Sequence, residues 1–455
     1  MEEDIKQRLA SPLARTKTEV KVEDRLEAAI EVADNRLKYE SAHDEELLGA
    51  LAIVAKFIVR KKRVCYGGTA MNEILPDSKK FYDPNMDVPD YDFYTPDVDS
   101  DVKELVEDLN AAGYKDVYHK VGIHEGTKKI LANFVPIADI SAINSELFTV
   151  LLRRSVLKNG MHYTDPDILR MMMFLELSRP KGMVSRWNKV FERLQLINQV
   201  FPIKGCKGYR HEHLEPAIPM DLRKAAIEYC IQQRRILCNG DLAGLYERGI
   251  RRKNTRFKIQ AGGPVLMTSP DPKADAKVLK IVFDQPDIRM YLHASRGEIV
   301  PMRVELRKGN LPICMFVEET ACHSYNTFSL DNGKKIQVAS LEFLITLHLS
   351  MDIFTHNSRD YLGDRGLCNV KQFIELYEKN SKALHSQFPP FSLTCTGHQV
   401  GFASLLRKKV ERIKREKDAA ESIKVSRSKT HKRSGHKRTG HKRSAHKRSV
   451  KRRKI

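Results

Sequence analysis

Hydrophobic positions recur at helical spacing near the start of the chain. This pattern predicts helices over residues 23–40 and 43–61. In the second helix one apolar stripe is formed by Leu47, Leu48, Leu51, Val54, Phe57 and Ile58. Such a stripe indicates packing against a core. A short strand over Arg63–Tyr66 follows, then a tight turn at Gly67 and Gly68, and then a helix over Thr69–Leu75 that Pro76 ends.

Strand and helix patterns then alternate up to about residue 200. The expected strands are Tyr91–Tyr94, Val117–Ile123 and Lys128–Ile143, and the expected helices are Val102–Ala112, 165–178 and 183–199. This part of the chain is therefore predicted to be a mixed α/β domain with an appended helical segment.

A second body can be recognised from about residue 216 to residue 400. Its expected helices are Met220–Ile236 and Leu341–Phe354, and its expected strands are Val278–Phe283, Ile299–Leu306 and Leu311–Val317. No second glycine-pair turn precedes an Asp-x-Asp strand in this half. If the second body repeats the architecture of the first, it has lost the residues that carry the chemistry.

Composition supports a chain with several packed parts. Its 455 residues are 41% hydrophobic, which is enough for two or three cores. No apolar run reaches the roughly 20 residues of a membrane helix, and the chain opens with Glu2, Glu3 and Asp4, so we expect a protein that is neither secreted nor membrane-spanning. The eight cysteines show no C-x-x-C spacing, and we expect them to be reduced, mostly buried thiols.

Positive charge is concentrated at the end of the chain. Residues 405–455 hold 22 Lys or Arg against 4 Asp or Glu, or +18 of the total +21. A basic pentapeptide starts at His431 and recurs from His436, His441 and His446. Because the repeat has no apolar residues with which to build a core, the tail is expected to be disordered and to bind polyanions such as nucleic acid. A localisation or packaging signal and a solubilising extension are the alternatives.

The candidate chemistry lies in three aspartates. Asp90 and Asp92 are two residues apart on an expected strand, so their side chains point to the same side and need a cation between them. Asp139 falls late in another expected strand, directly after the apolar run 135–138. With it, two Mg²⁺ or Mn²⁺ ions about 3.5–4 Å apart could activate an attacking hydroxyl and stabilise a leaving pyrophosphate.

The glycine pair supplies the second half of the expected site. The amides of Gly67 and Gly68 can approach phosphate oxygens closely, and the following helix directs its positive end at them. Thr69 and Asn72 could add a hydroxyl or amide contact, although a capping role for Thr69 is equally consistent with the pattern.

Cationic residues in the helical segment are further candidates. Arg186 and Lys189 lie one turn apart on the expected helix 183–199 and could neutralise a triphosphate or an RNA backbone, as could Arg170. A solvated helix face is the alternative interpretation.

These motifs resemble a known family. The strand, glycine turn, Asp-x-Asp pair and distal Asp are similar to the nucleotidyltransferase fold of the DNA polymerase β superfamily. The runs 66–70 and 89–92 resemble the poly(A) polymerase catalytic subunit of nucleocytoplasmic large DNA viruses, with further similarity at 163–170, 176–180 and from 185 onward. The resemblance covers roughly residues 40–400. The superfamily's common turn is Gly-Ser, whereas Gly68 takes the second place here.

The resemblance implies an α+β architecture. Its expected parts are a polymerase β-like nucleotidyltransferase domain with a helical segment (41–200) and a second α/β domain (201–404) that could be a degenerate copy of the first. The pattern and composition of the chain add an N-terminal helical segment (1–40) and the disordered basic tail (405–455).

The resemblance also implies an activity. AMP would be added from ATP to RNA 3′ ends, with Asp90, Asp92 and Asp139 as metal ligands and Gly67 and Gly68 at the triphosphate. A homodimer or a separate processivity subunit is expected, as is a place in the host cytoplasm, at the viral factory, or in the virion. Transfer to a non-RNA acceptor, such as a cyclic dinucleotide or a small molecule, and a non-catalytic RNA-binding scaffold remain open.

Overall fold

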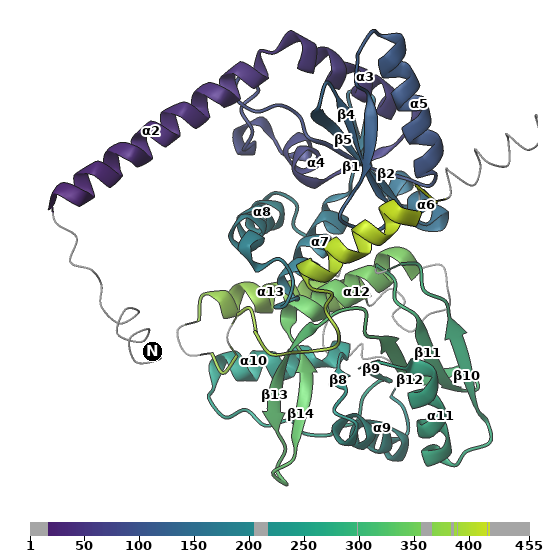
Figure 1. The fold of residues 1–455 in the computed structure, drawn as a ribbon. Helices are drawn as coiled ribbons and strands as arrows, with labels where there is room; N and C mark the ends of the chain where they lie inside the picture. Colours follow the sequence, from purple (N-terminus) through teal and green to yellow (C-terminus); the bar gives the residue numbers. More distant parts are fainter. Residues whose placement is uncertain are drawn as a thin grey trace, which may run out of the picture. The chain divides into compact units, whose positions relative to one another are not determined.

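The computed structural model describes residues 17–203, 217–297, 299–355, 366–383, 386–388, 390–415 and 417–418 (Figure 1). The chain divides into two compact units. The first unit contains the residues up to Lys120 together with Gly126–Gly401, and it holds both sheets. The second unit contains Val121–Glu125 and the residues from Phe402 onward, of which 402–415 are helical. The basic repeats that begin at His431 lie outside the described residues.

A seven-stranded mixed sheet forms the first half of the larger unit. Its strands are β1 (Val64–Tyr66), β2 (Tyr91–Thr95), β3 (Tyr118–Val121), β4 (Thr127–Ala132), β5 (Val135–Ala142), β6 (Val156–Lys158) and β7 (Met161–Tyr163), in the order β3-β4-β5-β2-β1-β7-β6. Its helices are α2 (Lys17–Ala42), α3 (Glu45–Lys61), α4 (Gly67–Ile74), α5 (Val98–Ala111), α6 (Ser145–Arg154), α7 (Pro166–Leu177) and α8 (Trp187–Val200).

A second mixed sheet forms the other half of this unit. Its strands are β8 (Ile236–Leu237), β9 (Val265–Ser269), β10 (Ile288–His293), β11 (Arg303–Lys308), β12 (Leu311–Glu318), β13 (His323–Ser329), β14 (Lys335–Ala339) and β15 (Cys395–Thr396), in the order β10-β11-β12-β9-β8-β14-β13-β15. Its helices are α9 (Met220–Gln232), α10 (Ala243–Arg251), α11 (Pro272–Phe283), α12 (Leu341–Thr355) and α13 (Gly366–Ser381).

The two sheets repeat one topology. Adding seven to each strand number of the first order gives the second order, apart from the extra strand β15. Strand directions repeat as well, because β2 and β5 are parallel like β9 and β12, and β1 and β7 are parallel like β8 and β14. The pairs β1 with β2 and β8 with β9 are both antiparallel.

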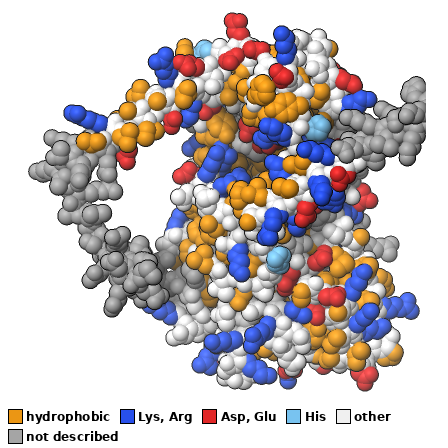
Figure 2. Space-filling view, viewed as in Figure 1, with side chains coloured by type: hydrophobic (Ala, Val, Ile, Leu, Met, Phe, Trp, Pro, Cys, Tyr) orange, Lys and Arg blue, Asp and Glu red, His pale blue; other side chains and the backbone are white. Residues whose placement is uncertain are grey.

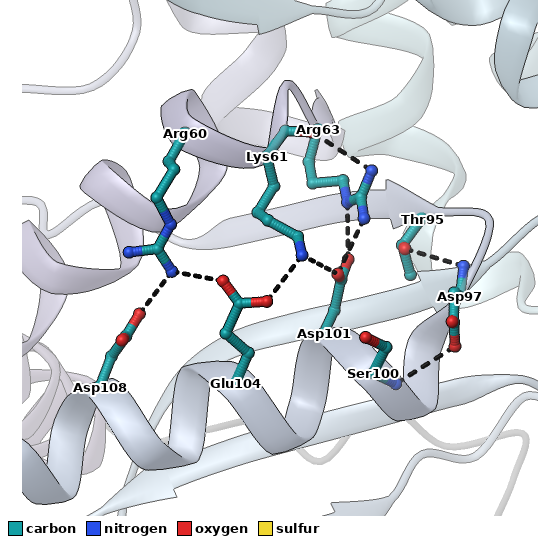
Figure 3. Close-up of polar contacts among 9 residues, drawn as sticks. All are labelled: Arg60, Lys61, Arg63, Thr95, Asp97, Ser100, Asp101, Glu104 and Asp108. Carbon is teal, nitrogen blue, oxygen red and sulfur yellow. Dashed lines mark hydrogen bonds and ion pairs between the residues drawn. The ribbon is translucent and has the colours of Figure 1, made fainter.

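A buried ion pair is repeated at the same place in both halves. Arg63, just before β1, donates Nε and Nη2 to the two carboxylate oxygens of Asp101 on α5 at 2.6 and 2.8 Å (Figure 3). Arg235, just before β8, binds Asp275 on α11 in the same way at 2.8 and 3.0 Å. The helices also begin alike, since Asp97 caps α5 and Asp271 caps α11. The two halves therefore share these details as well as their strand order.

Most expected elements of the first half have counterparts, with one break. The expected strand Lys128–Ile143 is two strands, β4 and β5, because Asn133 and Phe134 adopt positive φ and turn the chain back on itself. The short hairpin β6–β7 was not expected. In the second half, the expectation of a strand at Val278–Phe283 is wrong, because these residues are the end of helix α11. The expected strand Ile299–Leu306 instead runs over Arg303–Lys308.

Alternation along the central strands separates a packing face from a polar face. Phe93 and Ile140 are fully buried in one cluster with Val54, Phe57 and Leu105 of α3 and α5. Their neighbours Asp92 and Asp139 therefore point to the opposite face of the sheet. The packing of α3 and α5 thus fixes the face on which the candidate site lies.

The expectation of reduced cysteines is wrong for Cys322, Cys368 and Cys395, which are all disulfide-bonded. Cys322 and Cys395 form a disulfide, with their Cα atoms 5.3 Å apart. Antiparallel pairing of β13 with β15 brings them together across 73 residues of sequence, so their spacing in the chain gave no indication of it. Cys65, Cys230, Cys238 and Cys314 are buried free thiols, as expected.

Helix α2 carries apolar side chains on its surface. Val22, Leu26, Ile30 and Leu37 are all more than half exposed, and Figure 2 shows the hydrophobic colour along this helix. Among the helices that the structure describes, none combines the length and apolar character needed to cross a bilayer.

Candidate active site

Two of the three candidate aspartates lie side by side. Asp92 on β2 is the register partner of Asp139 on β5 in a parallel pair, so both side chains project from the same face of the sheet. Asp90 directly precedes β2, two residues from Asp92. Its backbone amide donates to Thr69 Oγ1 at 3.1 Å, which ties this end of the strand to helix α4. The sheet register is therefore what brings the carboxylates together.

The carboxylates destabilise one another's charged forms. Burial, followed by the charges of Asp90 and Asp139, raises the pKa of Asp92 to about 7. Desolvation and the charge of Asp139 also raise the pKa of Asp90. Lys129 on β4 opposes both shifts, and its Nζ lies 2.8 Å from Asp139 Oδ1. The site is thus a cluster of carboxylates with the ammonium group of Lys129 beside Asp139.

The glycine pair is shaped by its neighbours. Gly67 adopts φ of +77°, and a Cβ built on it would lie 2.5 Å from Asp92 Oδ2. A Cβ on Gly68 would collide with the Tyr82 hydroxyl and lie 3.1 Å from an Arg193 guanidinium nitrogen. Helix α4 begins at Gly67 without a side-chain cap from Tyr66. Gly67 therefore lets the Asp92 carboxylate approach the start of this helix, and Gly68 leaves room for Tyr82 and Arg193.

Thr69 and Asn72 serve the framework of the site. Both are buried. Besides accepting from Asp90, Thr69 sits in the first turn of α4. Asn72 Oδ1 accepts from the backbone amides of Phe81 and Tyr82 at 2.9 and 3.0 Å. These bonds place the 81–82 segment over the glycine turn.

Arg193 is a site residue that the sequence analysis missed. It lies on α8, its Nη2 donates to the Tyr82 hydroxyl at 2.9 Å, and its guanidinium is 4.7 Å from the centroid of the Phe81 ring. Lys189 and Arg193 lie four residues apart on α8 and so share one helix face, and Arg186 directly precedes this helix. This spacing was the available signal. The charge of Arg186 opposes the rise in the pKa of Asp92, and the charge of Lys189 opposes the rise in the pKa of Asp90. Both cations are therefore close enough to act on the carboxylates.

Arg170 does not lie with this cationic face. Its side chain is 1% exposed, and it bonds Asp167, the Asn198 side chain at 2.7 Å and the carbonyl of Phe201. These contacts join α7 to α8 inside the protein. The structure therefore gives Arg170 a packing role and does not support the expected contact with triphosphate or RNA.

The residues present fit a divalent cation held together with substrate oxygens. Within the described ranges, no group of three or more His, Cys, Asp or Glu side chains is arranged to hold a metal by itself. Asp92 and Asp139 nevertheless share a face, and Lys129 supplies positive charge beside them. Magnesium commonly takes one or two carboxylates and completes its shell with phosphates and water. This donor set suits such a site.

Known proteins are similar to this chain in the region that contains the candidate site. Residues 52–183, which contain the glycine turn and all three aspartates, match the family model of the poly(A) polymerase catalytic subunit. The expected resemblance is confirmed. A relative from African swine fever virus named as that subunit is 29% identical over 168 residues, covering 36% of this chain and 35% of the relative. One from Acanthamoeba polyphaga mimivirus is 31% identical over 158 residues, covering 34% and 26%.

The similarity to these relatives is confined to part of each chain. The match spans about a third of the African swine fever virus relative and about a quarter of the mimivirus relative. A solved structure, the Megavirus polyadenylate synthase, extends the likeness in three dimensions. It superposes with a TM-score of 0.72 over 90% of this chain and 85% of its own, at 17% identity. The mixed α+β fold is therefore shared well beyond the region matched by the family model.

Proposed function

We propose that this protein is a template-independent polynucleotide adenylyltransferase that adds AMP from ATP to RNA 3′ ends. The observation that carries the proposal is the pairing of Asp92 with Asp139 on one sheet face beside the glycine turn of α4. The family match over residues 52–183 supports RNA polyadenylation among the reactions that this arrangement can perform.

Each part of the site has a task in this reaction. Asp90, Asp92 and Asp139 would hold Mg²⁺ or Mn²⁺, which lowers the pKa of the attacking 3′-hydroxyl and stabilises the leaving pyrophosphate. The amides of Gly67 and Gly68 at the start of α4 bind triphosphate oxygens. Arg186, directly before α8, and Lys189 and Arg193 on α8 provide positive charge over the same region. Their fixed charge favours the transfer of a highly anionic substrate.

The second half is proposed to be a degenerate nucleotidyltransferase copy. Asp92 stands five residues before the α5 cap Asp97, and Leu266 stands five residues before the α11 cap Asp271. By this alignment Pro264 replaces Asp90 and Leu266 replaces Asp92. Met315 replaces Asp139, because it is the register partner of Leu266. No carboxylate remains at these three positions, so this half would not catalyse transfer.

Partners follow from the same proposal. RNA and ATP are the substrates, and processivity would come from a second copy, from a separate subunit or from the basic tail that begins at residue 405. The tail's excess of Lys and Arg would hold RNA near the site in a salt-dependent way.

Primer extension tests the proposal. The full chain is incubated with an oligo-RNA, Mg²⁺ or Mn²⁺, and each of the four nucleoside triphosphates separately. We expect extension with ATP. The variant Asp92→Asn should abolish it, whereas Asp99→Asn, which changes an exposed aspartate on α5, should not. Product formed without primer would indicate a non-RNA acceptor. RNA binding without product from any nucleotide would indicate a scaffold and refute the enzymatic function.

A further inference from the structure

A cavity of about 510 Å³ lies in the second half, beside Gly240, the counterpart of Gly68 in the candidate active site. It is lined by the segment from Gly240 through α10, by residues 257–263, and by Asn369 and Gln372 of α13. Gly240 follows β8 as Gly68 follows β1. A Cβ on Gly240 would collide with Asn369 of α13, as one on Gly68 would press on Arg193 of α8. The second half thus has a recess where the first half holds its glycine turn.

The cavity wall is strongly basic. Five basic residues line it, Arg223, Arg248, Arg251, Arg252 and Lys258, against the two acidic residues Asp241 and Glu247. Both acids already have partners, since Asp241 pairs with Arg223 at 2.5 Å and Glu247 with Arg251 at 2.8 Å.

The two acidic residues of the wall leave the charges of Arg248, Arg252 and Lys258 without a partner inside the cavity. Lys258 reaches Asp331 only at 4.0 Å, on an exposed part of the surface. Within the part of the chain that the structure describes, Arg248 and Arg252 form no ion pair. An excess of unpaired guanidinium groups in a recess attracts anions, and guanidinium binds phosphate with directed hydrogen bonds. The polar side chains of Gln260, Asn369 and Gln372 add hydrogen-bonding groups without charge.

Buried contacts hold the recess in shape. Arg223 is 5% exposed, donates Nε to the carbonyl of Gln260 at 2.8 Å and also bonds the carbonyl of Gly263. It therefore fixes the 260–263 segment against Asp241. The volume is in the range of sites that hold a small ligand such as a mononucleotide.

We propose that this cavity is a non-catalytic site for the phosphate groups of a ribonucleotide. Arg248 and Arg252 bind the phosphates, and the amide side chains contact sugar or base. The ligand is either one nucleotide of the RNA chain or a free nucleoside triphosphate, which share this chemistry. The absence of carboxylates at Pro264, Leu266 and Met315 removes the groups that would hold metal ions. Binding without turnover follows.

The test compares full-length variants by binding, so its outcome does not depend on whether the protein elongates RNA. The affinity of a labelled 15-nucleotide oligo(A) RNA is measured at increasing salt. Each phosphate contact to a single strand contributes about 0.7 to the slope of log K against log salt, so Arg248→Ala/Arg252→Ala should flatten the slope by about 1.4. Arg248→Lys/Arg252→Lys keeps the charge and should retain most of the slope. Arg289→Ala, an exposed change on β10 outside the cavity, should leave it unchanged.

A second measurement separates the two sources of phosphate. Equilibrium dialysis with ATP and Mg²⁺ counts bound nucleotide per chain. Loss of one ATP site in the double alanine variant identifies a free nucleotide as ligand. An unchanged ATP count with the flattened RNA slope identifies the RNA chain. If the slope and the ATP count both match wild type, or if Arg289→Ala changes them as much, the proposal is overturned. Should the alanine variant fail to fold, Arg248→Gln/Arg252→Gln, which removes both charges and keeps long polar side chains, should flatten the slope by the same amount, and an unchanged slope would overturn the proposal.

Discussion

The buried ion pair between Arg63 and Asp101 should be a main determinant of stability in the first half. Asp101 is completely buried and receives two hydrogen bonds from Arg63, whose side chain is only 13% exposed (Figure 3). Lys61 Nζ lies 3.8 Å from the same carboxylate. The pair connects the residue before β1 to the first turn of α5, so it fixes the strand that carries the glycine turn.

Replacing Asp101 with alanine leaves the Arg63 guanidinium largely buried without its partner. Breaking a buried pair in this way typically costs 3–5 kcal/mol, and the partial exposure of Arg63 favours the lower end, about 3 kcal/mol. Glu104→Ala removes a neighbouring carboxylate that is more exposed and binds Lys61 and Arg60. Glu104→Ala should therefore lose much less free energy of unfolding than Asp101→Ala, because solvent screens exposed ion pairs.

Urea unfolding followed by the fluorescence of Trp187, the single tryptophan, reports on the first half. With an m value of about 3 kcal/mol/M, a loss of about 3 kcal/mol lowers the midpoint by about 1 M. Asp275→Ala removes the equivalent pair of the second half, and hydrogen exchange should show the loss of protection there. If Asp101→Ala shifts the midpoint no more than Glu104→Ala does, the argument for this pair is refuted.

Three further predictions follow from the packing. Gly68→Ala should reduce RNA extension by pushing aside the Tyr82 hydroxyl, and Gly68→Ala/Tyr82→Phe should restore part of it, as initial rates would show. Burial lowers the pKa of His348 from its usual 6.5 to about 4, so stability that is present above pH 6.5 is lost as the pH falls through about 4, by up to about 3 kcal/mol. Urea midpoints at pH 7 and 4.5 should differ less for His348→Gln, and an equal difference would contradict this. Cys395→Ser should cost up to about 4 kcal/mol, because the Cys322 bridge closes a long loop, and reductant should abolish the difference between variant and wild type.

The sequence predicted the first half well where local signals are dense. The glycine pair, Pro76 and the stripe of helix α3 each have a direct local cause, and β1, α4 and β2 lie close to where they were expected. The hairpin β6–β7 was missed because each strand has only three residues. Such short segments form through pairing with the sheet and carry little pattern of their own.

The error at 278–283 has a different origin. Val278, Ile281 and Val282 form an apolar run that resembles a strand, yet they are about half or more exposed on α11. Asp271 as cap and Pro272 in the first turn were the helix signals that the run obscured.

The candidate site was only partly accessible from the sequence. Asp90, Asp92 and Asp139 stood out because charge in or beside an apolar strand is unusual. Lys129 and Arg193 did not stand out. Lys129 reaches Asp139 through the register of β4 with β5, and Arg193 reaches the site because the 81–82 segment folds over Gly68. Contacts of this kind arise from tertiary structure.

A comparison of the two halves shows what the candidate site costs the fold in stability. At the positions of Asp92 and Asp139 the second half places Leu266 and Met315, both at most 1% exposed, and its strand β9 is buried along its whole length. Apolar residues there gain the burial energy that a packed sheet face offers. The first half instead keeps two carboxylates on adjacent strands, where burial and mutual repulsion raise the pKa of Asp92 to about 7. The second half shows that the same fold can form without paired carboxylates, which lower its stability. We therefore infer that the first half keeps them because its chemistry needs their charge. The comparison of the two halves is thus independent support for locating catalysis in the first.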